Sequence, residues 1–190
     1  MNPRLVAGLR VALLMIFAIL VQTTFGDDLR VDRVAPDLMV LLAICAGLTG
    51  GAESGAWVGF WAGLLADLSL TATPLGLSAL TYCLIGAAVG ALRTGLLPES
   101  WLVIPAAAVV GTAAAAVLWV GLGDVLGQSQ LLDSGRAWLI RVVLVEAGWA
   151  ALLALPVNWL YARAARGSRG ADRVGSIKGR IVAPGRLTAR

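Results

Sequence analysis

The chain of 190 residues is 59% hydrophobic and only 14% charged, with a formal net charge of +4. A soluble domain carries about 25% charged residues, so this composition indicates an integral membrane protein with little mass outside the bilayer. The chain contains no histidine, which excludes Ser–His catalysis and histidine-based zinc sites. We expect no cofactor. Cys45 and Cys83 both fall in apolar runs, so we expect free thiols packed as small hydrophobic side chains.

Six apolar segments are candidates for membrane-spanning helices, each of which needs about 20 mostly apolar residues. In chain order they cover residues 5–25, 36–50, 54–70, 75–93, 101–122 and 138–161. The second segment is short and begins at Pro36, a residue suited to the first turn of a helix. The pattern therefore predicts six helices forming one bundle, or four spans if residues 36–70 are a re-entrant hairpin.

The distribution of basic residues predicts the orientation. With six spans, 11 of the 15 Lys and Arg residues lie on one side of the membrane. Since basic residues are enriched in cytoplasmic segments, we expect both termini to be cytoplasmic.

We divide the chain into a transmembrane domain, residues 1–162, and a basic tail, residues 163–190. The tail is rich in Gly and Arg and cannot bury a core, so its composition predicts disorder. Its expected partner is the anionic lipid of the cytoplasmic leaflet rather than nucleic acid. A topology signal with no other role explains the same charge.

Glycines at a spacing of four are the most informative pattern in the chain. The third segment contains Gly55, Gly59 and Gly63, and the fourth contains Gly86 and Gly90. Residues four apart lie on one face of a helix. Each interior Gly costs about 1 kcal/mol in a soluble helix, whereas in lipid small residues let two backbones approach closely. We therefore expect these five glycines to form helix-packing or partner interfaces.

Asp67 continues the glycine series and places a carboxylate at the end of an apolar segment, where the charge needs either water or a partner. It is either a helix-end carboxylate reached by water or a group that faces protein and has a partner. A negative charge near a helix C-terminus opposes the helix dipole, which favours a partner. Arg141, about one turn inside the sixth segment, is the natural candidate. Glu146 lies deeper and points about 140° away from Arg141, so these two are not a simple pair.

An enzyme is the least favoured class. Asp67 with Glu146 or Asp124 is a conceivable pair of carboxylates for peptide cleavage, but no motif accompanies it, and acids also occur in structural networks. No phosphate-binding loop is present. We therefore expect no catalytic residue and no metal site. The short, glycine-interrupted segments 36–50 and 54–70 are similar to elements of transporter cores.

The order of short motifs over about residues 10–95 resembles the MreD family of bacterial rod shape-determining membrane proteins. The motif residues are Gln22, Pro36, Asp37, Pro74 and Gly76, with the glycine series and Asp67 between them. The resemblance implies a bundle like the S-component of energy-coupling-factor transporters. It also implies a nonenzymatic scaffold in the bacterial cytoplasmic membrane that binds MreC, within a complex that includes MreB, RodA and a class B penicillin-binding protein.

The related S-components supply the alternative function, a substrate-binding subunit of a vitamin transporter. S-components typically carry A-x-x-x-A in their first helix, and the nearest equivalent here is Gly8 with Ala12. Co-purification discriminates between the two functions. Recovery of MreC supports the scaffold, and recovery of an ATPase module with a vitamin supports transport.

Overall fold

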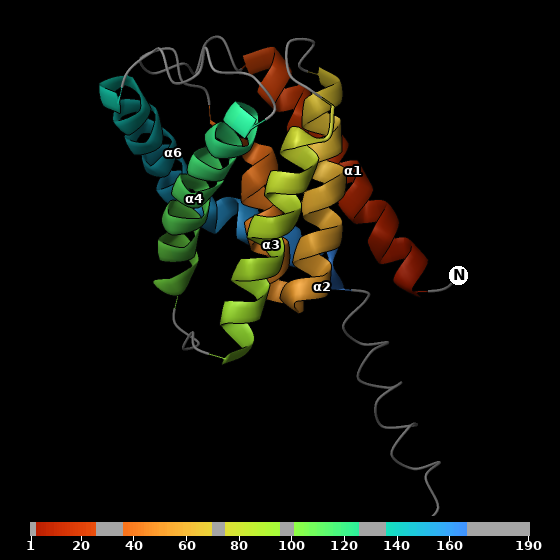
Figure 1. Cartoon of the computed structure of the whole chain (residues 1–190). Coiled ribbons are helices and arrows are strands. Elements are labelled where there is room, and N and C mark those ends of the chain that lie inside the picture. The colour runs from red at the N-terminus through yellow and green to blue at the C-terminus, as the bar shows by residue number, and fades with distance from the viewer. Residues whose placement is uncertain (1–2, 26–35, 70–74, 96–100, 126–135, 167–190) are drawn as a thin grey trace, which may run out of the picture.

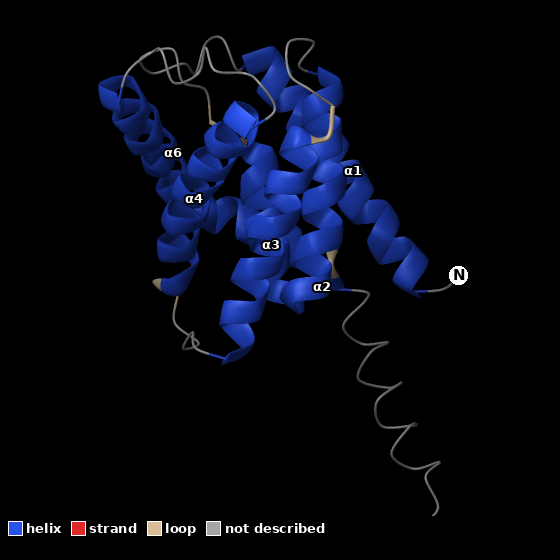
Figure 2. Ribbon diagram, viewed as in Figure 1, coloured by secondary structure: helices blue, strands red, loops and turns tan. Residues whose placement is uncertain are grey.

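The computed structural model describes residues 3–25, 36–69, 75–95, 101–125 and 136–166, and within these ranges every regular element is a helix (Figure 2). The helices are α1 (Pro3–Phe25), α2 (Leu38–Ser69), α3 (Leu77–Gly95), α4 (Val103–Val125) and α6 (Arg136–Ala164). Four of these, α1, α2, α4 and α6, contain stretches long and apolar enough to cross a membrane, while the apolar part of α3 is shorter. The sequence predicted six helices, and the described residues form five.

The difference in number lies in α2, which is bent sharply at Gly51. Gly51 has φ 83° and ψ −175°, a backbone conformation essentially restricted to glycine. An ideal Cβ on Gly55 would lie 2.9 Å from the Cα of Gly47, although residues eight apart in a straight helix are separated by about 12 Å. The two arms of α2 therefore fold back on each other as a helical hairpin. They correspond to the predicted segments 36–50 and 54–70.

The first arm of α2 is the centre of the molecule. Every residue from Met39 to Leu48 is buried, and a helix that is apolar on all sides belongs in the interior. In α2, 61% of the most apolar stretch is buried, against 17% in α1, 22% in α4 and 11% in α6. Figure 1 shows α2 and α3 side by side, with α1 on one side of this pair and α4 on the other. The first arm spans only about 20 Å at 1.5 Å per residue, less than the hydrocarbon core of about 30 Å.

Contacts between distant residues define two ends of the bundle. At the first end, Ala7 near the start of α1 and Ala165 just beyond α6 line one groove, and Ser54 Oγ lies 3.4 Å from Tyr161 Oη. At the second end, the Leu38 N–H donates to Gln22 Oε1 at 3.2 Å. The start of α1 and the end of α6 therefore lie at the same end of the bundle. α6 ends at Ala164, and most of the predicted tail, residues 167–190, lies outside the described residues.

The bend at Gly51 makes a first prediction. Gly51→Ala should lower the free energy of unfolding by about 1–3 kcal/mol, because an L side chain is strained at this φ and ψ even though nothing lies within 4 Å of the added Cβ. Thermal unfolding in a neutral detergent measures the change. Gly148→Ala in α6 is the matched control, because its Cβ also meets nothing within 4 Å. Equal stability of the two variants would show that the bend is not as described.

Candidate functional site

The glycine face of α2 packs directly against the backbone of α3. A Cβ added to Gly55, Gly59 or Gly63 would fall under 3.0 Å from backbone atoms of α3. The α3 glycines return the contact, because a Cβ on Gly86 or Gly90 would meet the backbone of Gly55 or Gly51 at the same close range. All five glycines expected at helix-packing or partner interfaces are thus placed in one interface within the chain. Small residues allow this approach in lipid, where packing rather than the hydrophobic effect joins helices.

The tryptophans on the same arm point the other way. Trp57 is 60% exposed and Trp61 is 50% exposed, whereas Gly59 and Gly63 are buried. The orientation of this arm is therefore unambiguous. Its small-residue side faces α3, and its aromatic side faces away from the core and is free to contact lipid or another protein.

Asp67 lies where α2 ends and α3 begins. Its side chain is only 2% exposed. The Gly76 N–H donates to its Oδ2 at 2.8 Å, the Ala79 N–H donates to the same oxygen at 3.2 Å, and the Ser78 N–H donates to its Oδ1 at 3.2 Å. The carboxylate therefore accepts hydrogen bonds from N–H groups that have no partner within the first turn of a helix. We name these four residues the Asp67 clamp.

The clamp resolves the charge question that the sequence posed. Asp67 is near the C-terminus of α2, where a negative charge is unfavourable, but it sits directly against the N-terminus of α3, where one is favourable. Three backbone donors account for its burial without Arg141, whose side chain is exposed. Gly76 contributes through its φ of 100°, a conformation that suits glycine. Pro74, the other motif residue of this loop, lies outside the described residues.

A second carboxylate caps the start of α2. Asp37 Oδ1 accepts from the N–H groups of Met39 at 2.9 Å and Val40 at 3.2 Å, as an N-cap residue does. The Tyr82 hydroxyl of α3 donates to Asp37 Oδ2. Gln22 of α1 accepts a hydrogen bond from the neighbouring Leu38 N–H, and Pro36 is buried next to Asp37. Through Gln22 and Asp37, the motif residues connect the start of α2 to α1 and to α3. Nothing in the sequence pattern indicated Tyr82.

A cavity of about 270 Å³ opens beside Asp37, among α2, α3, α4 and α6. We call it the polar cavity, after the polar and aromatic side chains in its wall: Asp37, Ser78, Tyr82, Thr112, Trp119 and Glu146. The Trp119 indole N–H donates to Ser78 Oγ at 3.3 Å. Of the predicted intramembrane polar residues, only Glu146 lies here, with Asp37 rather than with Asp67. The Asp124 side chain is outside the described part.

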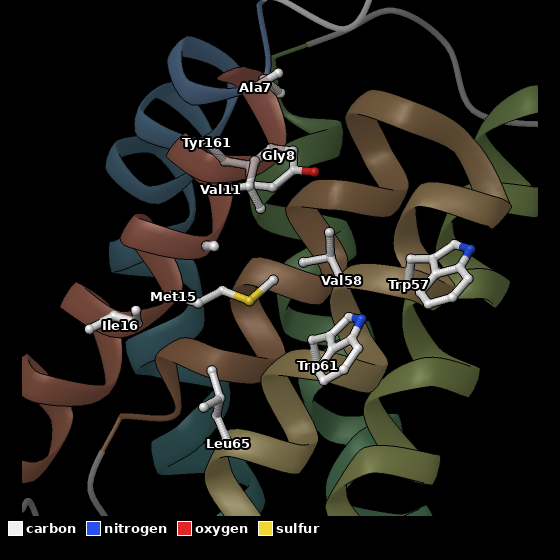
Figure 3. Close-up of a pocket in the computed structure, with 12 residues that line it drawn as sticks. Ala7, Gly8, Val11, Met15, Ile16, Trp57, Val58, Trp61, Leu65 and Tyr161 are labelled. Carbon is white, nitrogen blue, oxygen red and sulfur yellow. The ribbon is translucent and has the colours of Figure 1, made fainter. Parts of the chain in front are cut away.

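The third feature is an open apolar groove of about 580 Å³ between α1 and the second arm of α2 (Figure 3). One wall is the face of α1 that contains Ala7, Gly8, Val11, Ala12 and Met15. The other wall is formed by Trp57, Val58, Trp61 and Leu65 of α2, with Tyr161 at one end. Nothing lies within 4 Å of a Cβ added to Gly8. This groove presents small and aromatic apolar groups together.

Metal binding finds no support in the described ranges, where no group of three or more His, Cys, Asp or Glu side chains could hold an ion.

A comparison with protein families matches residues 3–163 to the family described as rod shape-determining protein MreD. Neither the curated proteins nor the solved structures contain a match to this chain.

The glycine interface makes a second prediction. Gly59→Leu should destabilise the fold by about 3 kcal/mol, because the new side chain must displace the α3 backbone at Tyr82, which cannot yield as a flexible side chain can. Titration with a denaturing detergent measures the loss. Gly121→Leu in α4 is the control, since no atom lies within 4 Å of its Cβ. If Gly59→Leu were as stable as the control, α2 and α3 would not be in backbone contact.

The Asp67 clamp makes a third prediction. Asp67→Asn should cost about 1.5–3 kcal/mol, the usual range for hydrogen bonds to a charged group, because the amide replaces a carboxylate held by three N–H donors. Arg141→Gln added to it should be additive within about 0.5 kcal/mol, since the clamp does not include Arg141. A double-mutant cycle read by thermal unfolding measures both. A coupling energy above about 1 kcal/mol would instead assign Arg141 as the partner of Asp67.

Proposed function

Because this chain belongs to the MreD family of rod shape-determining membrane proteins, we propose that it is a nonenzymatic scaffold of the bacterial cell-elongation complex. In this role it binds an MreC-like protein and helps localise or regulate peptidoglycan synthesis, with RodA, a class B penicillin-binding protein and MreB as further members of the complex. The family match over residues 3–163 carries the proposal. The fold supports it, because Asp67 caps α3 and does not line the cavity that contains Glu146, the acid weighed as its catalytic partner.

The proposed location is the bacterial cytoplasmic membrane, crossed several times, with both termini cytoplasmic. Two observations support the orientation. The start of α1 and the end of α6 lie at the same end of the bundle, which requires an even number of crossings. At that end the Arg163 guanidinium lies 4.8 Å from the centre of the Trp159 ring, an arrangement suited to the membrane interface, where Trp and basic residues concentrate. Six crossings are an even number, and so are four crossings with α2 as a re-entrant hairpin.

The groove along α1 is the surface that we propose for the partner. The glycine faces of α2 and α3 are occupied by each other, so they are not available to a second protein. Gly8 and Ala12 form another small-residue pair at a spacing of four, and they line the open groove instead of packing against a helix of this chain. Since such pairs mark close helix packing in membranes, we assign the groove to the transmembrane helix of the MreC-like partner.

A substrate-binding subunit of a vitamin transporter, with the S-component fold, is the second candidate. One observation favours it, the polar cavity among α2, α3, α4 and α6, which is large enough for a small molecule. Recovery of an ATPase module and a vitamin with the tagged chain, in place of an MreC-like protein, would select this function.

The groove makes a fourth prediction. Gly8→Leu should reduce recovery of the MreC-like protein with the tagged chain at least about tenfold, because the side chain fills the groove and separates the helices. The fold should tolerate it, since no atom lies within 4 Å of the new Cβ. Gly148→Leu, equally unobstructed but on α6, is the control and should recover the partner at the wild-type level. Equal recovery by both variants would move the partner surface away from α1, and failure of the wild-type chain to recover an MreC-like protein would reject the scaffold itself.

A further inference from the structure

The polar cavity has two carboxyl groups in its wall, and the fold uses only one of them. Asp37 and Glu146 both line it, and none of its lining residues is Lys or Arg. Asp37 is engaged as the cap of α2 and as acceptor of the Tyr82 hydroxyl. Glu146 is half-buried on α6 and lies in the cavity wall, where it caps neither α2 nor α3. A carboxyl group in an apolar span is costly without a partner, and a cation in the cavity would be such a partner for Glu146.

A second, independent feature of this cavity also points to a ligand. Thr112 of α4 lines the cavity and is only 3% exposed, and its Oγ1 has no hydrogen-bond partner among the described residues. Buried hydroxyl groups are usually satisfied. The unpartnered oxygen of Thr112 and the carboxylate of Glu146 can both accept hydrogen bonds, which an ammonium group with three N–H donors can supply.

The aromatic side chains of the cavity fit the same chemistry. Trp119 and Tyr82 line it, and their polar atoms are directed to Ser78 and Asp37 respectively. The aromatic rings thus contribute to the wall while their donors are engaged elsewhere. The face of an aromatic ring attracts an organic cation, with Trp the most effective. A wall with two carboxyl groups, two aromatic rings and no Lys or Arg suits an ammonium ion better than a phosphate or a carboxylate.

The neighbouring apolar cavity indicates what the ammonium group is attached to. This cavity, of about 350 Å³ between α4 and α6, shares Ala116, Val120 and Val143 with the wall of the polar cavity. Its other lining residues are Val117, Ile140 and Leu144, all apolar. The shared residues make the two cavities adjacent. A ligand with a charged group in the first cavity and a hydrocarbon chain in the second is an amphiphile.

We propose that the polar cavity binds the ammonium group of an amphiphilic primary amine, whose hydrocarbon chain occupies the apolar cavity between α4 and α6. Glu146 is the counter-ion, Thr112 accepts a hydrogen bond, and Trp119 contacts the cation. The amine is either the head group of a membrane lipid such as phosphatidylethanolamine or a free long-chain amine. This inference stands on the cavity and does not depend on the scaffold role.

Decylamine is the probe for the chemistry, titrated into the full chain in a neutral detergent and read by thermal unfolding. We expect it to raise the midpoint of the wild-type chain by several degrees, since a ligand that binds only the folded state stabilises it, whereas decanol should not. Glu146→Gln should weaken decylamine binding at least about tenfold, because it removes the counter-ion while keeping the shape. Glu53→Gln, which changes an exposed carboxylate of α2 outside the cavity, should bind as the wild type does.

Thr112→Val is the second variant and should weaken binding several-fold while leaving the unliganded midpoint close to that of the wild type, because the lost oxygen has no partner in the fold. Decylamine binding that survives Glu146→Gln unchanged, or an equal effect of decanol, would overturn the proposal. Native mass spectrometry of the chain extracted from membranes then distinguishes the sources. Phosphatidylethanolamine retained over phosphatidylglycerol, and lost in Glu146→Gln, identifies the lipid, and decylamine binding without such retention identifies a free amine.

Discussion

Direct contact between the backbones of α2 and α3 is the interaction on which the rest of this structure depends. In lipid there is little hydrophobic gain from bringing two apolar helices together, so packing at close range must hold them. Glycines at a spacing of four provide that range at Gly55, Gly59 and Gly63, and Gly86 and Gly90 complete it from the other helix. The hairpin at Gly51 adds the first arm of α2 to the same contact and places it at the centre of the bundle.

The buried carboxylates follow from that arrangement. When helices begin inside an apolar bundle, their first N–H groups have no water to bind and need acceptors from the protein. Asp67 supplies the acceptor for α3, and Asp37 supplies it for α2. The carboxylates Asp37 and Asp67 therefore have a structural role, because each caps the first turn of a helix. Glu146 is the described intramembrane carboxylate that this explanation leaves without a role, which is why the polar cavity is the place to look for a ligand.

The sequence predicted the class of protein, the family and the face of the helix that carries the glycines, because composition and a spacing of four report on local structure. It did not predict which neighbour that face meets, since periodicity defines a face but not its partner. Asp67 was expected either to meet water at a helix end or to face protein, with Arg141 as the natural candidate for its partner. The short loop to Gly76 was the available signal that the next helix N-terminus would serve instead. The cavity residues that the sequence did not indicate lie on different turns of two apolar helices, Tyr82 on α3 and Thr112 and Trp119 on α4. No local pattern shows that they share a cavity.

The functional proposal uses the same division between internal and external surfaces. The tightest small-residue faces are used within the chain, and the Gly8 face with the exposed Trp57 and Trp61 is left for another helix.

Backbone amide hydrogen exchange of the chain in a neutral detergent, read by mass spectrometry, tests the packing of α2 against α3 most directly, since the most densely packed elements open last. We predict the slowest exchange in the first arm of α2 and in α3, with α1 faster. Equal or slower exchange in α1 would contradict an α2–α3 core.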